Sequence, residues 1–141
     1  KLEEVIRRNS IIGIAEKELS PVLLHAAAFD KSISSIALLE PYSSYRSLVL
    51  NRFYKSSNIS GVVPASLKEY DLPLLAGSLA PRRLLIAGPT DGNGKTENME
   101  MINEDLDIIR QLYLKNDAGK AITIIPASDE WKFESLIKEW Y

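Results

Sequence analysis

The stretch RRLLIAGPTDGNGKTENMEMI contains the residue types of a phosphate-binding loop. An apolar run leads into a glycine-rich loop, and Lys95 and Thr96 complete the ending of the motif G-x-x-x-x-G-K-[ST]. The spacing departs from the motif, because five residues rather than four separate Gly88 from Gly94. Asp91 also lies inside the loop, where its charge would repel a phosphate from converging backbone N–H groups. These features argue against a nucleotide-binding module, and Thr96 is interpreted as the cap of the following helix.

Three carboxylates, Glu18, Asp91 and Asp129, each follow an apolar run that predicts a buried strand. Because the carboxyl ends of parallel strands meet at one edge of a sheet, these acids could gather there. Such a cluster could bind a hard cation or act as an acid–base set. The alternative is that they are, in order, a solvated turn acid, a turn former and an acid at a helix N-terminus. No cofactor is expected from the sequence.

The composition is that of one globular domain with a hydrophobic core. Of 141 residues, 45% are apolar and 26% are charged, and the formal net charge is −2. This balance gives no electrostatic case for nucleic acid or an anionic membrane, and no apolar run approaches the roughly 18–20 residues of a membrane span. The absence of cysteine excludes disulfides and thiolate metal sites. The start at Lys1, without Met, suggests a piece of a longer protein, with any signal for secretion or the periplasm upstream.

Four short apolar runs predict β-strands at 11–15, 33–40, 83–88 and 121–126. The last three do not alternate strictly between apolar and polar residues, which is typical of parallel strands buried on both faces. Helical patterns lie between the runs. This alternation predicts a single α/β domain over residues 1–141, with a mostly parallel sheet of about four strands and helices on both faces, in three α/β/α layers.

Helices are expected at 20–30, 43–54, 97–115 and 129–141. The first has Ser20 as its expected N-cap, followed by proline at the first helical position. The other three carry apolar stripes, namely Tyr45, Leu48, Val49 and Phe53, then Met99, Ile102, Leu106, Ile109 and Tyr113, and finally Phe133, Leu136, Ile137 and Trp140.

Two stretches, GIAEKELSPVLLHAAAFDKSISSIALLEPYSSY and LAPRRLLIAGPTD, resemble parts of the C-terminal half of an α/β hydrolase. The first resembles the region after strand five, where a strand turns sharply through the nucleophile elbow into a helix. The second is similar to acetyl xylan esterase-like and dienelactone hydrolase-like proteins, in which a short helix, Ala-Pro-Arg, a strand and a loop with the catalytic acid follow in that order. The resemblance implies an α/β-hydrolase-like fold over strands five to eight, with Asp91 at the acid position.

The other two positions of the implied triad do not hold the residues that catalysis needs. The nucleophile position falls on Glu18 or a neighbour, between the strand end and the helix start. Ser20 is the sole hydroxyl nearby, and Pro21 after it has no N–H for an oxyanion hole. The base position, after the last strand, falls near Asp129 rather than on a histidine. The single histidine, His25, precedes the acid in the chain and is interpreted as a packed helix residue.

The sequence therefore favours a catalytically degenerate domain that serves as a scaffold or accessory part of a larger esterase-like protein. The alternative is an active carbohydrate ester hydrolase that is completed by upstream chain. In both cases the strand at 11–15 would be an unpaired sheet edge, and we expect it to pair with the upstream part of the same protein or with a second copy.

Overall fold

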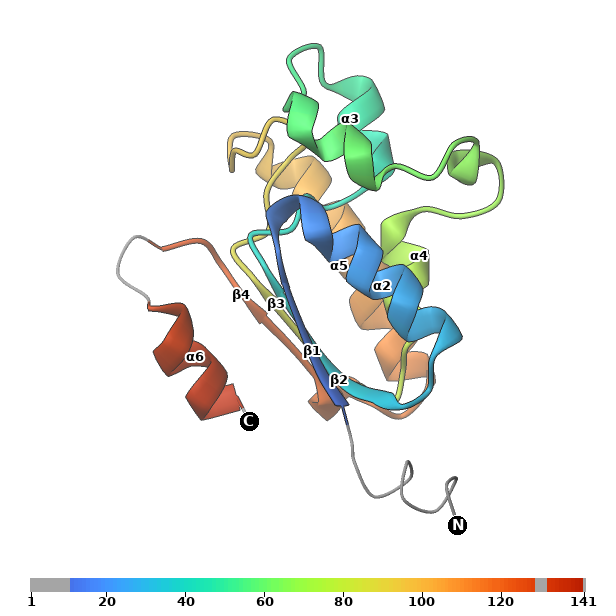
Figure 1. Ribbon diagram of the computed structural model, residues 1–141, viewed down its shortest axis with the longest axis vertical. Coiled ribbons are helices and arrows are strands. Elements are labelled where there is room, and N and C mark those ends of the chain that lie inside the picture. Colours follow the sequence, from blue (N-terminus) through green and yellow to red (C-terminus); the bar gives the residue numbers. More distant parts are fainter. Residues whose placement is uncertain (1–10, 129–131, 141) are drawn as a thin grey trace.

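A computed structural model describes residues 11–128 and 132–140, which form a parallel sheet with helices on both faces (Figure 1). The strands are β1 (Ile11–Glu16), β2 (Ile33–Leu39), β3 (Arg83–Ala87) and β4 (Ile122–Ile125). They pair in the order β1-β2-β3-β4, and each pair is parallel. The predicted α/β fold with about four parallel strands and helices on both faces is confirmed.

The helices are divided unequally between the two faces (Figure 1). Three of them, α2 (Ser20–Phe29), α4 (Leu72–Gly77) and α5 (Met99–Lys115), cover one face, and α6 (Phe133–Trp140) lies against the other. Within residues 11–128 and 132–140, every helix is too short or too polar to cross a membrane. The remaining helical segments are α3 (Tyr45–Leu50) and the 3₁₀ turns η1 (Lys17–Leu19), η2 (Ser56–Gly61), η3 (Ser66–Lys68) and η4 (Gly119–Ala121).

The two central strands are buried on both sides, which explains why their sequences read as continuous apolar runs. One set of side chains packs with α2, α4 and α5, and the alternate set packs with α6. The first set includes Ile36, Leu38, Leu84 and Ile86, and the second includes Ala37, Leu39, Leu85 and Ala87.

The predicted apolar stripes are confirmed for α5 and α6. In α5 the stripe is buried from its second residue onward, and in α6 all four stripe residues pack into the smaller core cluster. The stripe predicted over 43–54 is wrong in its second half, because Val49 and Phe53 are each 72% exposed. The helix ends at Leu50 and reaches the core through Tyr45 and Leu48, so later residues point away from it.

Arg82, from the Ala-Pro-Arg segment, connects three separate elements. Its Nη1 donates to the carbonyl oxygens of Ala27 (2.7 Å), Ile33 (3.0 Å) and Asp30 (3.3 Å). Its own carbonyl oxygen accepts a hydrogen bond from the hydroxyl of Tyr113, 2.9 Å away. The residue therefore fixes the end of α2 and the start of β2 relative to α5, and this places β2 correctly in the sheet.

We predict that Arg82→Ala lowers the free energy of unfolding by about 2–3 kcal/mol, because three backbone carbonyls lose a charged donor. Urea denaturation followed by circular dichroism measures this change. Arg110→Ala is the control, since its guanidinium pairs with the exposed carboxylate of Asp107 one helical turn away and should contribute about 0.5 kcal/mol or less. Equal effects of the two substitutions would contradict the assigned role of Arg82.

Candidate functional site

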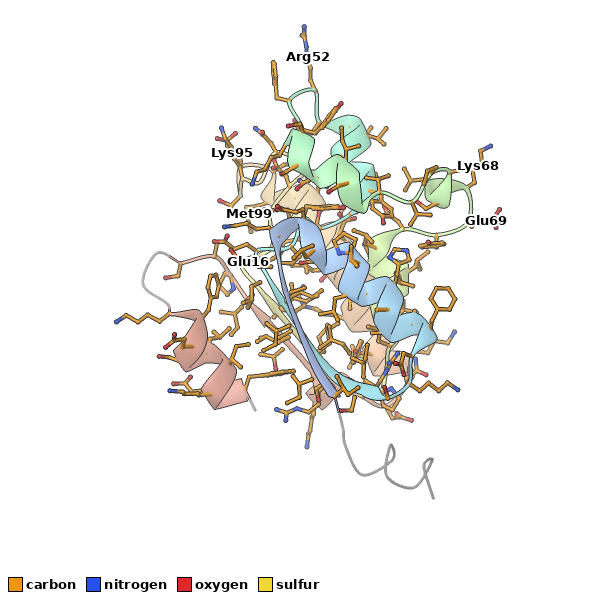
Figure 2. All side chains as sticks on the ribbon, in the orientation of Figure 1. Glu16, Arg52, Lys68, Glu69, Lys95 and Met99 are labelled. Atoms are coloured by element: carbon orange, nitrogen blue, oxygen red, sulfur yellow. The ribbon has the colours of Figure 1, made fainter. Side chains whose placement is uncertain are left out.

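A cleft of about 350 Å³ lies at the carboxyl edge of the sheet, where the strands end. Ligands of open α/β sheets bind at this edge, because the loops that leave the strands converge there. Figure 2 shows Glu16 at this end of β1, with Lys95 and Met99 near the same edge. The charged and polar side chains that line the cleft include Lys17, Glu40, Tyr42 and Lys95.

The chain leaves β1 through a sharp turn into α2. Lys17, directly after the strand, has a φ of +50°, a conformation that costs free energy for any residue with a Cβ. A strand, a strained residue and then a helix form the local geometry of a nucleophile elbow. The strained position falls on Lys17, the neighbour of Glu18, on which the resemblance places the nucleophile position. Glu18 lies inside the short turn η1.

The ammonium group of Lys17 is held between two carboxylates. Its Nζ lies 2.8 Å from Oε1 of Glu16 and 3.1 Å from Oε2 of Glu40. The hydrogen bond to Glu16, then the one to Glu40 and their charges, raise the pKa of Lys17 to about 12. The amine is therefore protonated at neutral pH and has no free electron pair with which to attack a carbonyl carbon. Lysine nucleophiles need the opposite, a lowered pKa.

Asp91 lies in the loop after β3 and is 5% exposed. Its Oδ1 accepts hydrogen bonds from the backbone N–H groups of Asn93 (2.8 Å) and Lys95 (3.0 Å). Its Oδ2 lies 3.4 Å from Nδ2 of Asn51. Both carboxylate oxygens are thus used to hold the loop in shape. This geometry favours the interpretation of Asp91 as a turn former over that of an acid that orients a catalytic base.

The same loop is unsuited to a phosphate. Backbone N–H groups that converge on an anion are the basis of a phosphate loop, and here two of them bind the carboxylate of Asp91. The ammonium of Lys95 pairs with Glu97 at 3.1 Å. Thr96 does not cap the helix as the sequence suggested. Asn98 does, because its Oδ1 accepts from the N–H of Met101 at 3.3 Å.

His25 is a packed residue between α2 and the segment before α4. Its Nδ1 lies 2.6 Å from the carbonyl oxygen of Pro21, and its Nε2 lies 2.8 Å from the hydroxyl of Tyr70. Since a carbonyl only accepts, Nδ1 carries the proton and the tyrosine hydroxyl donates to Nε2. Both ring nitrogens therefore have partners away from Asp91, in agreement with the structural interpretation of this histidine.

Ser20 is neither a cap nor an accessible nucleophile. The N-cap of α2 is Leu19, with no capping hydrogen bond from a side chain, and Ser20 is the first helical residue. Its hydroxyl is buried, has no hydrogen-bond partner within the described residues and lines a small internal cavity of about 20 Å³. The expected cap fails because the helix begins one residue early, directly from η1.

The resemblance places the catalytic base in the loop after β4, and only part of this loop is among the described residues. After β4 the loop continues through Ala127, which lines the cleft, while Asp129 lies outside the described residues. Within residues 11–128 and 132–140, no group of three or more His, Cys, Asp or Glu side chains could hold a metal ion. Glu18 and Asp91 therefore belong to no such group in that part of the chain.

The cleft also contains a hydrogen-bond donor that the sequence did not indicate. The hydroxyl of Tyr42 is buried and has no hydrogen-bond partner in the described part of the chain. Burial raises the pKa of Tyr42, so the hydroxyl keeps its proton at neutral pH. The ion pair of Lys17 with Glu40 was also missed, because Glu40 is distant in sequence and comes close only through the pairing of β1 with β2.

Comparisons of the chain with protein-family models, with curated proteins and with solved structures returned no match. The function is therefore argued from the geometry of the site.

We predict that Asp91→Ala lowers the free energy of unfolding by about 1–3 kcal/mol, because two backbone N–H groups in the loop lose their acceptor. Glu97→Ala is the matched control in the same loop, since its carboxylate is exposed and pairs only with Lys95 among the described residues; its effect should be about 0.5 kcal/mol or less. Urea denaturation distinguishes the two variants. A stable Asp91→Ala protein would contradict the role of Asp91 as turn former.

We also predict that ATP with magnesium produces no saturable increase in melting temperature, because the carboxylate of Asp91 occupies the loop. A thermal-shift titration measures this. A saturable shift that disappears in Lys95→Ala would instead restore the nucleotide-binding hypothesis.

Proposed function

We propose that this chain is a catalytically degenerate α/β-hydrolase-like domain, similar to acetyl xylan esterase-like proteins, which acts as a scaffold or accessory part of a larger protein. The order of its elements supports the proposal. A strand, a sharp turn and a helix come first, and parallel strands follow, with Asp91 in the loop after β3 and a helix after the last strand. This is the order that the resemblance to strands five to eight implies.

The observation that carries the proposal is the ion-paired lysine at the elbow-like turn. The backbone keeps the strained conformation that displays a nucleophile, yet Lys17 is a protonated ammonium between Glu16 and Glu40. Cationic lysine cannot form an acyl intermediate. No described side chain at the cleft is an imidazole, because the single histidine is bound to Pro21 and Tyr70.

An inactive domain of this kind would act by binding other parts of a protein through its surface. Its partners would be the upstream part of the same protein or a second copy, joined at the unpaired edge of β1. A carbohydrate ester is the substrate only in the alternative, in which upstream chain supplies a nucleophile and a base to the same cleft.

We expect the purified chain to hydrolyse p-nitrophenyl acetate no faster than Asp91→Ala does, because no described side chain at the cleft is an imidazole that could activate a hydroxyl. Lys17→Ser, which places a hydroxyl at the strained turn, should also remain inactive, since no imidazole accepts its proton. Initial rates at pH 7–8 measure both expectations. Turnover by the unaltered chain that Asp91→Ala abolishes would contradict the proposal and favour an active esterase.

A further inference from the structure

Two hydroxyl groups in the core have no partner within the folded chain. They are the hydroxyl of Ser20, the first residue of α2, and that of Tyr42, in the segment after β2. Both oxygens are buried and have no hydrogen-bond partner among residues 11–128 and 132–140. Ser20 is 2% exposed and Tyr42 4%. A buried hydroxyl without a partner destabilises the fold, because it has lost its hydrogen bonds to water, so a pair of them calls for a physical explanation.

Ser20 and Tyr42 both line the internal cavity of about 20 Å³ that lies between the sheet and its covering helices. Most of the other residues around it are aliphatic and come from α2, α4, α5 and the two central strands. A single water molecule needs about 10–15 Å³ of space for its centre, together with two to four polar partners. The cavity therefore has room for one water molecule and for no larger ligand.

The hydroxyl of Tyr42 reaches the start of α2, next to Ser20. A Cβ atom at Gly61 would lie 3.4 Å from the tyrosine oxygen and 3.5 Å from Cγ of Pro21. Pro21 directly follows Ser20 in the chain. The tyrosine oxygen and the first turn of α2 are thus neighbours of the same point, which is the geometry that a bridge between the two hydroxyl groups requires.

A third hydroxyl residue, Ser43, also lines the cavity. Its Oγ donates to Oδ2 of the buried Asp105 at 2.7 Å. A serine hydroxyl has one donor and two acceptor lone pairs, so the oxygen of Ser43 can still accept a hydrogen bond. Buried water molecules typically make three hydrogen bonds, and the cavity has three hydroxyl residues in its lining.

We propose that this cavity is a binding site for one structural water molecule, held between Oγ of Ser20 and the hydroxyl of Tyr42. The water gives each of these oxygens a hydrogen-bond partner. It connects the start of α2, just after the strained turn at Lys17, to the segment that follows β2. The inference goes beyond the proposed function and does not depend on it, because a water molecule at this place is compatible with an active or an inactive domain.

Urea denaturation of the full chain tests the proposal through the sign of the change. We expect Ser20→Ala and Tyr42→Phe each to lower the midpoint of unfolding, because each removes a hydrogen bond of the water. Unpaired hydroxyl groups would give the opposite result, since removal of an unsatisfied buried group raises the midpoint. Ser57→Ala is the matched control. Its Oγ is likewise buried without a partner in the described part of the chain, but Ser57 does not line the cavity, so its midpoint should stay unchanged or rise.

The double variant S20A/Y42F and a high-resolution crystal structure of the unaltered chain complete the test. The double variant should lose less stability than the two single variants lose in sum, because the first substitution already loosens the shared water. The crystal structure should show one ordered water within about 3 Å of both oxygens. An empty cavity, a water that contacts only one of the two oxygens, additive losses, or a midpoint that does not fall in either single variant would overturn the proposal. An equal fall in Ser57→Ala would overturn it too.

Discussion

The four strands pair in parallel, and the two central ones are buried on both faces; the placement of the helices and of the cleft follows from this pairing. Parallel neighbours cannot be joined by a tight turn, so each connection must return over the sheet, and here α2, α4 and α5 return over one face. The same pairing brings all carboxyl ends to one edge, which creates the cleft. It also leaves the second face to be covered, and α6 covers it with the stripe that ends at Trp140.

The loop after β3 shows how an internal charge can replace a ligand. Glycine-rich loops at helix starts bind anions because their N–H groups converge, and this loop converges on the carboxylate of Asp91. The loop thus has the glycines, Lys95 and Thr96 that resemble a phosphate loop, while the carboxylate of Asp91 occupies its N–H groups. In neither case is it free to act on a ligand, because both of its oxygens are hydrogen-bonded.

The strained backbone position after β1 and the exposed apolar side chains around β1 lie in different places. At its carboxyl end, Lys17 holds a positive φ that two ion pairs help to maintain, although the side chain placed there has no reactive lone pair. Along its outer edge and over α2, large apolar side chains such as Phe29 remain in water. The strained turn with an ion-paired ammonium and the exposed apolar side chains both support the proposal of an accessory domain.

Features that depend on local patterns can be predicted from the sequence. The four strands, the helix predicted over 97–115 and found over 99–115, and the apolar stripe of the last helix follow from apolar runs and periodicity. Which side chains meet could not be predicted from these patterns. Glu40 reaches Lys17 through strand pairing, Asn98 rather than Thr96 caps α5, and Asp91 turns inward on its own loop. The Lys17–Glu40 pair depends on contact between segments that are distant in sequence, whereas the hydrogen bonds of Asn98 and Asp91 are local and depend on backbone dihedrals that the pattern of residue types leaves open.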